Sequence, residues 1–219
     1  MKYIMKYIGI DIDDTVSDSN RAVLSLMKKR YGIEMAPEDR TTFMLHDSPK
    51  LRNRLGPYEG EQLFADVWKE HKSMRLIDLN IPKYVRSLRR RFGGITMITS
   101  SPGSSLDIKA FLRGNEIEFD RFEHVGLADK YLLPVVACLD DCDYVALTCS
   151  MVKPTVLFSQ PWNRNFRDLL IQQRDTSIKI ADNWAVVEER LVDAIEGRPA
   201  RRPILELLRE RQNSKSHQT

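Results

Sequence analysis

The stretch Ile8-Gly9-Ile10-Asp11-Ile12-Asp13-Asp14-Thr15-Val16 decides the fold, because an apolar run here ends in three carboxylates within four residues. Such a run is typical of a buried parallel strand whose carboxyl end faces a ligand site. Like charges at a strand end repel one another, so a bound cation is their natural compensation. Side chains alternate along an extended segment, which places Asp11 and Asp13 on one side and Ile12 in the packing. Hard carboxylate oxygens favour magnesium as the cation.

A second apolar run ends in the same way. Val135 to Leu139 leads directly into Asp140 and Asp141. An isolated pair of this kind is typical of a loop or a helix N-cap. Two acidic strand ends lying side by side instead predict one metal cage, and magnesium needs only one or two carboxylates together with waters and phosphate oxygens. The candidate metal ligands are Asp11, Asp13, Asp140 and Asp141.

Groups suited to a phosphate lie between the two acidic ends. Thr99-Ser100-Ser101-Pro102 follows the apolar residues 95–98, and Lys130 lies in Leu127-Ala128-Asp129-Lys130. A hydroxyl with nearby backbone N–H groups can hold phosphate oxygens, and an ammonium can neutralise the charge that develops during phosphoryl transfer. Taken singly, a Ser-Ser-Pro segment is usually a turn and a lysine is usually solvated. Their position between the two acidic strand ends gives them weight.

The apolar runs predict an α/β fold, a Rossmann-like parallel sheet with helices on both faces. Helix-length segments separate the runs, at 81–92, 104–113 and 184–195, and glycines follow the last two. The expected strands are 7–12, 95–99, 124–127, 135–139, 155–158 and 178–181.

One region breaks the alternation of strand and helix. From 19 to 79 the pattern is helical throughout, with prolines and glycines as punctuation, which predicts a helical cap inserted after the first strand. The expected division is a core domain of residues 1–18 and 80–197, a cap of residues 19–79, and a C-terminal helix and tail of residues 198–219, with the helix at 204–211.

Composition is that of an ordinary globular protein and limits the classes of partner. The 219 residues are 42% hydrophobic and 30% charged, which argues against a disordered chain. A net charge of +3 is too balanced to predict a polynucleotide groove. The three cysteines, Cys138, Cys142 and Cys149, fit reduced packing residues. Because no long apolar segment or cleavage site is present, we expect a soluble cytoplasmic protein with no membrane partner.

The order of these motifs resembles the four-part signature of the haloacid dehalogenase superfamily: Asp-x-Asp-x-Thr, a hydroxyl residue after a strand, a lysine, then Asp-Asp after a strand. The resemblance spans roughly residues 5 to 195. Within the superfamily, the helical insertion is similar to the small cap of the 5'(3')-deoxyribonucleotidases. Further segments similar to that group are Ser101-Pro102, Asp129-Lys130, Leu139-Asp140-Asp141, Val156-Leu157-Phe158, Pro161-Trp162-Asn163 and Asn183-Trp184.

The resemblance implies a magnesium-dependent phosphomonoesterase acting on (deoxy)nucleoside monophosphates. Asp11 would be the nucleophile that forms an aspartyl-phosphate, Asp13 the general acid and base, and Lys130 the phosphate partner. Magnesium would be held by Asp11, the backbone carbonyl of Asp13, and Asp140 or Asp141. Thr15, Thr99, Ser100 and Ser101 would face the phosphate; the second-motif hydroxyl is Thr99 or Ser100, with Thr99 slightly favoured.

Substrate choice would fall to the cap. Phe43 and Trp68 are candidates for stacking on a base, although aromatics at helical spacing are more often the core of a small bundle. The alternative functions are a polynucleotide 3'-phosphatase, which would need an open basic approach, and a phosphatase of another small metabolite. A receiver-type signalling domain would place its lysine last, and a non-catalytic phosphate-binding module would seldom keep every catalytic position. The sequence leaves a homodimer open.

Overall fold

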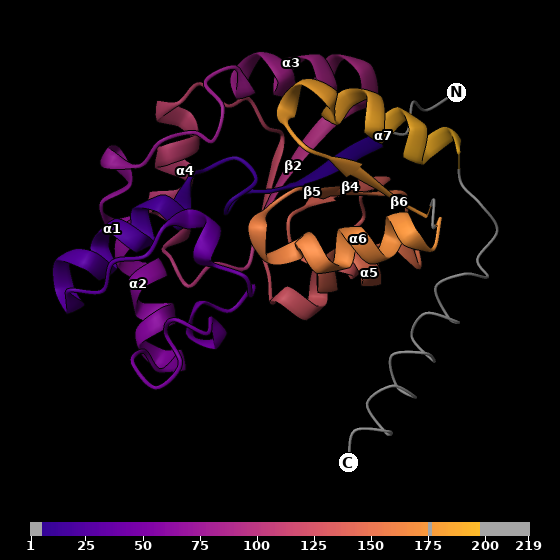
Figure 1. The fold of residues 1–219 in the computed structure, drawn as a ribbon. Helices are drawn as coiled ribbons and strands as arrows, with labels where there is room; N and C mark the ends of the chain where they lie inside the picture. Colours follow the sequence, from indigo (N-terminus) through magenta and orange to yellow (C-terminus); the bar gives the residue numbers. More distant parts are fainter. Residues whose placement is uncertain (1–5, 175–176, 198–219) are drawn as a thin grey trace.

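The computed structural model describes residues 6–174 and 177–197, and its centre is a six-stranded sheet in which every neighbouring pair is parallel. The order across the sheet is β3-β2-β1-β4-β5-β6 (Figure 1). The predicted α/β class with a Rossmann-like parallel sheet is confirmed. The strands are β1 Lys6–Asp11, β2 Gly93–Thr99, β3 Arg121–His124, β4 Ala137–Asp140, β5 Thr155–Phe158 and β6 Ile178–Ala181.

Strand order places the two acidic ends next to each other. β2 and then β3 lie on one side of β1, and β4, β5 and β6 follow one another on its other side, so the strand order reverses at β1. The crevice at such a reversal is where open α/β sheets bind their ligands. In the register of β1 and β4, Ile10 is paired with Leu139, so Asp11 and Asp140 follow as neighbours.

Helices cover both faces of the sheet (Figure 1). Helices α3 and α7 lie together on one face, and α5 and α6 lie on the other. The α-helices are α1 Ser19–Tyr31, α2 Pro57–Lys69, α3 Ile81–Phe92, α4 Ser105–Gly114, α5 Asp143–Ser150, α6 Arg164–Gln172 and α7 Val187–Glu196. Short 3₁₀ turns are η1 Pro37–Asp39, η2 Leu45–Asp47, η3 His71–Ser73, η4 Leu127–Leu132, η5 Pro161–Asn163 and η6 Trp184–Val186.

The insertion after β1 lies at one end of the molecule, where α1 packs against α2 (Figure 1). The prediction of helix throughout this region is wrong for residues 32–56 and for residues 70–79, where η3 is the only helical turn. Gly32 ends α1 in the left-handed conformation with φ of 64°, and Pro57 starts α2. Between them the chain forms only short 3₁₀ turns and bends. Prolines at 37 and 49 remove backbone donors, which explains why no long helix forms there.

The predicted strands match in number and order, with one misplaced. The expected strand at 124–127 is wrong: β3 is Arg121–His124, and Leu127 already begins η4. At a sheet edge a strand needs little apolar character, so the apolar residues that follow β3 misled the interpretation. The expected helix at 204–211 lies outside the described residues.

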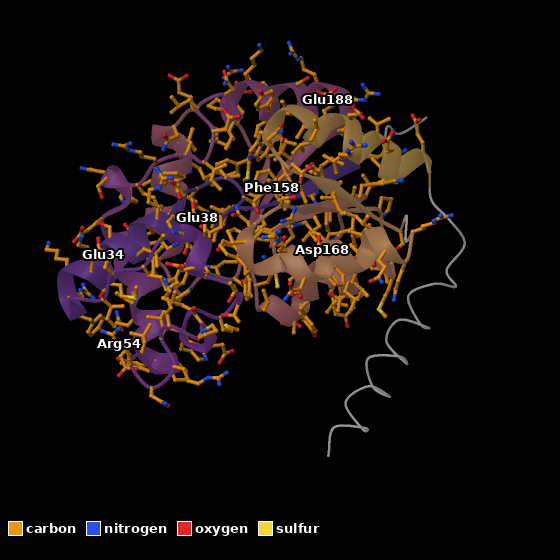
Figure 2. The ribbon with its side chains drawn as sticks, in the orientation of Figure 1. Glu34, Glu38, Arg54, Phe158, Asp168 and Glu188 are labelled. Atoms are coloured by element: carbon orange, nitrogen blue, oxygen red, sulfur yellow. The ribbon has the colours of Figure 1, made fainter. Side chains whose placement is uncertain are left out.

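Large aromatic side chains join the layers of the core. Trp184 is fully buried and its ring lies 6.3 Å from the rings of both Tyr84 and Phe158. Figure 2 shows Phe158 in the middle of the molecule, with Glu188 on the outer helix α7. No helix in the described ranges, 6–174 and 177–197, is long and apolar enough to cross a membrane.

Candidate active site

Three buried carboxylates meet at the adjacent ends of β1 and β4. Oxygen atoms of Asp11, Asp140 and Asp141 all lie within 4.8 Å of one another, and each residue is 3% exposed. Lys130, also 3% exposed, reaches this cluster from η4. Its Nζ donates to Oδ1 of Asp11 at 2.5 Å and to Oδ2 of Asp140 at 2.9 Å. The structure thus brings together the predicted nucleophile, the phosphate lysine and the second acidic end.

The charge of this cluster fits a divalent cation. Burial raises the pKa of Asp11 and of Asp141 well above their ordinary values, and in each case neighbouring carboxylates raise it further. Burial works against the charge on Lys130, but Asp11 and Asp140 hold its pKa well above the ordinary value. A metal ion binds carboxylates in their ionised form, and with all three ionised, one ammonium leaves an excess of negative charge for the cation to neutralise. The donor set, all carboxylate oxygens, is the kind that magnesium prefers.

The surroundings distinguish the two aspartates of the second motif. Oδ2 of Asp140 accepts from Lys130, and its Oδ1 accepts from the backbone N–H of Cys142 at 3.0 Å. Asp141 accepts from the indole Nε1 of Trp162 at 2.9 Å through Oδ2. Asn163 donates to the Asp141 carbonyl at 2.8 Å. Both oxygens of Asp140 thus accept from the protein, whereas Asp141 accepts from Trp162 through Oδ2 alone, which makes Asp141 the better candidate for direct metal contact.

Asp13 is held by one donor from α2 and one from the end of β2. Its Oδ1 accepts from Nε1 of Trp68 at 3.0 Å, and its Oδ2 accepts from Oγ1 of Thr99 at 3.1 Å. Burial, together with the negative charge of Asp14, raises the pKa of Asp13 to about 6. The two hydrogen bonds lower this pKa, because they favour the charged form, but their effect is the smaller one. A carboxyl group in that range can both give and take a proton near neutral pH. The Asp13 carboxylate lies outside the three-carboxylate cluster; a metal contact through its backbone carbonyl stays a prediction.

The hydroxyl residues of the second motif separate into two kinds. Thr99 is fully buried; it donates to Asp13 and accepts from the backbone N–H of Ser101 at 2.9 Å. Ser100 and Ser101 line the cavity above the cluster. The geometry thus favours Ser100 over Thr99 for contact with a phosphate, contrary to the slight preference from the sequence. Thr15 is fully buried and does not line the cavity, while its carbonyl accepts from Nε1 of Trp184 at 2.7 Å.

A buried ion pair that the sequence analysis missed joins the cap to the core. Arg40, 2% exposed, donates to Oδ2 of Asp14 at 3.1 Å, to Oδ1 of Asn20 at 3.2 Å and to the carbonyl of Phe43. Its guanidinium lies 4.1 Å over the ring of Trp162. Asp14 has φ of 56°, in the left-handed region, and its side chain is buried. Neither spacing nor periodicity marks Arg40, so no signal in the sequence could have found it.

A cavity of about 350 Å³ opens above the carboxylates. Its floor is formed by the charged residues Asp11, Asp13, Lys130 and Asp141, with Asp14 and Arg40 beside them, and by Ser100 and Ser101. Its remaining wall is supplied largely by the cap, and the residues there are Phe43, Met44, Leu45, His46, Gly60, Glu61 and Phe64, together with Pro102 and Leu127.

The structure places the two predicted stacking residues differently. Phe43 is half-buried and lines the cavity. Trp68 does not line it: the side chain is fully buried, and its ring packs edge-on against Phe111 with the centroids 5.5 Å apart. A base cannot stack on a ring that is already covered by protein, so the expectation for Trp68 is corrected to a packing residue that holds Asp13. Phe64, on the same helix, lines the cavity instead.

Solved structures share this fold. A protein from Clostridium difficile described as a phosphatase is 11% identical, with a TM-score of 0.57, over 85% of this chain and 98% of that one. A predicted phosphoglycolate phosphatase from Haemophilus somnus is 16% identical, with a TM-score of 0.55, over 84% and 97%. A phosphonoacetaldehyde hydrolase like protein from Oleispira antarctica is 12% identical, with a TM-score of 0.52, over 88% and 95%.

At these identities the similarity shows a shared fold alone, an α/β fold built on a Rossmann-like parallel sheet. A scan against protein-family models and a search of curated proteins found no match.

Proposed function

We propose that the chain is a magnesium-dependent phosphomonoesterase that works through an aspartyl-phosphate. The observation that carries the proposal is the position of Asp11: it lies beside Lys130 in the buried carboxylate cluster, at the floor of a cavity that Asp13 also lines. Fold similarity to proteins described as phosphatases supports the same class of reaction.

In the first half-reaction a carboxylate oxygen of Asp11 attacks phosphorus, and the bond from phosphorus to the ester oxygen breaks. Asp13 gives its proton to the departing alkoxide. Lys130 and the hydroxyl of Ser100 hold phosphoryl oxygens as charge redistributes. When bound, magnesium would neutralise phosphoryl oxygens and orient them for in-line attack.

In the second half-reaction a water molecule attacks the phosphorus of the aspartyl-phosphate while Asp13 takes its proton. The bond from phosphorus to Asp11 breaks, which releases inorganic phosphate and restores the Asp11 carboxylate and the protonated Asp13. Trp68 and Thr99 hold the Asp13 side chain in place throughout, because each donates to a different oxygen of that carboxylate.

The substrate we propose is a nucleoside monophosphate, as for the 5'(3')-deoxyribonucleotidases that the sequence resembles. A cavity of about 350 Å³ is at the small end of the range for ligand sites, which suits a small molecule such as a nucleoside monophosphate. Phe43 and Phe64 give the cavity aromatic surface on which a base could stack.

A phosphate-release panel tests both levels of the proposal. The panel holds 5'- and 3'-nucleoside monophosphates, neutral sugar phosphates and a 3'-phosphorylated oligonucleotide, each with magnesium. Release from nucleoside monophosphates at the highest kcat/KM supports the nucleotidase. If sugar phosphates are hydrolysed equally well, the phosphomonoesterase stands and the nucleotidase does not. No release from any phosphate monoester would reject the enzyme class.

A further inference from the structure

The cations at the cavity are already committed to partners. Among the described residues that line it, the side chains with a permanent positive charge are Arg40 and Lys130. Lys130 lies between Asp11 and Asp140 on the floor, where the transferring phosphoryl group must sit. A second anionic group of a substrate, farther from the floor, would have to find its counter-charge elsewhere.

Arg40 cannot easily supply that counter-charge. One of its terminal nitrogens donates to Asp14 and Asn20, and the other donates to the Phe43 carbonyl. Its guanidinium lies over the rings of Trp162 and Phe64, at 4.1 and 5.4 Å from their centroids. Breaking the buried pair to serve a ligand would leave Asp14 uncompensated, which is costly for a buried charge.

The cap side of the cavity carries negative charge instead. Glu61, in the second turn of α2, lines the cavity and is exposed to solvent. His46 lines the same wall, and its Nε2 lies 3.6 Å from the Asp47 carboxylate. The charge of that carboxylate would offset a positive charge on the His46 ring. The wall that meets the leaving group therefore presents a carboxylate and no free cation among the described residues that line it.

We propose that the cavity selects phosphate monoesters whose leaving group carries no negative charge, and that Glu61 is the residue that rejects anionic leaving groups. This rests on the proposed phosphomonoesterase function and adds its substrate class: neutral leaving groups such as nucleosides or polyols, which can offer hydroxyl or amine donors to Glu61. It also disfavours a polynucleotide end, because that leaving group carries a charge on every linkage.

Matched substrates that differ in one charge test the proposal. Glycerol 3-phosphate is compared with 3-phosphoglycerate, and a deoxynucleoside 5'-monophosphate with its 3',5'-bisphosphate. We expect kcat/KM to be about tenfold or more higher for the neutral member of each pair. In Glu61→Gln the ratio of neutral to anionic kcat/KM should fall about tenfold, and in Glu61→Lys it should fall further. Added salt should narrow the wild-type ratio, because ions screen an exposed charge.

Glu59→Gln is the matched control, since Glu59 lies on the same helix, is exposed and lies outside the cavity lining. The same loss of charge there should leave the ratio unchanged. Equal kcat/KM for the neutral and the anionic substrate in the wild type would overturn the proposal. So would a neutral-to-anionic ratio of kcat/KM in Glu61→Gln equal to that in Glu59→Gln.

Binding gives a second measurement that does not need turnover. Thermal stabilisation of the Asp11→Asn variant by each substrate, with magnesium, reports the same charge preference. If no phosphate is released by the wild type, the phosphomonoesterase proposal fails. The charge selectivity is still decided by whether the neutral ligand stabilises the protein more than its anionic partner.

Discussion

The indole Nε1 of Trp162 donates to Oδ2 of Asp141 at 2.9 Å, and the guanidinium of Arg40 covers the same indole ring at 4.1 Å. The N–H of the tryptophan thus orients a carboxylate of the candidate metal cluster, and the face of its ring contacts Arg40 of the cap. Asn163 adds a donor to the backbone carbonyl of Asp141, and Gln160 donates to the carbonyl of Asp14 at 2.5 Å. The segment 160–163 therefore holds both acidic strand ends.

Loss of the Trp162 donor should weaken metal binding. In Trp162→Phe the ring and its contact with Arg40 are largely kept, but Asp141 loses the N–H that orients it. Partners of this kind are typically worth about 10–100-fold in metal affinity. Titrating magnesium while following the melting temperature of the substrate-free protein measures the affinity without turnover.

Trp184→Phe is the control for that change. Trp184 is also buried, and its N–H donates to the Thr15 carbonyl instead of a carboxylate of the cluster. Both variants lose one indole donor, but only Trp162→Phe should shift the magnesium midpoint. Equal midpoints in the two variants would show that the bond to Asp141 does not position the metal site.

Replacing the nucleophile should remove activity and spare the fold. Asp11→Asn is nearly isosteric, but an amide cannot attack phosphorus, so phosphate release should fall to background for every substrate. Lys130 keeps Asp140 as a partner, and one carboxylate with a raised pKa is removed from a crowded buried cluster. We therefore expect a melting temperature without metal close to that of the wild type, measured by circular dichroism. Wild-type turnover in a folded variant would reject Asp11 as the nucleophile.

The sequence could predict the floor of the site because a parallel sheet brings strand ends together. Apolar runs ending in Asp11 and Asp140 were enough to predict their proximity, and the register of β1 and β4 confirms it. The choice between Thr99 and Ser100 depends on how the chain turns at the end of β2. Composition and spacing carry no information on that turn.

The walls of the site depend on contacts between distant segments, which local patterns do not report. Trp68 and Asp13 are 55 residues apart, Arg40 and Asp14 are 26 apart, and Trp162 and Asp141 are 21 apart. Helical periodicity favoured a core role for Trp68 but left stacking on a base open. Only the packing against Phe111 decides between these two roles.

Trp68 should matter most for substrates that need a proton on the leaving group. Trp68→Phe removes the donor to Oδ1 of Asp13 while keeping a ring in the packed position. Alkyl phosphates require general acid catalysis, typically worth about 10²–10⁴-fold, whereas p-nitrophenyl phosphate has a leaving group that departs without a proton. We expect kcat/KM, which reports the first half-reaction, to fall about tenfold for an alkyl ester and much less for p-nitrophenyl phosphate.

Phe111→Leu serves as the comparison, because it disturbs the packing of Trp68 without removing the hydrogen bond. If both variants lower kcat/KM equally on both substrates, Trp68 acts through stability alone. A selective loss on the alkyl ester in Trp68→Phe supports its role in holding the proton donor.

Chelation should stop turnover, and only hard cations should restore it well. The cluster offers carboxylate oxygens from Asp11, Asp140 and Asp141, without a sulfur or imidazole ligand among the described residues within 4.8 Å. We expect no phosphate release in EDTA, recovery with magnesium, and poor recovery with zinc. Rescue by zinc alone would show that the ligand set has been misassigned.

The aromatic wall of the cavity should distinguish a nucleotide from a smaller phosphate ester. Phe43 and Phe64 both line the cavity, and stacking of a base on an aromatic ring is worth ~1–3 kcal/mol by alanine substitution in single-strand binders. Phe43→Ala should therefore lower kcat/KM for a nucleoside monophosphate by roughly tenfold to a hundredfold and change kcat/KM for glycerol 3-phosphate much less. Phe64→Ala tests the second ring in the same way. Because the Arg40 guanidinium lies over the Phe64 ring, the melting temperature of this variant is compared with that of the wild type. Equal losses on both substrates, with a lower melting temperature, would assign these rings to the cap core and remove the support for a base site.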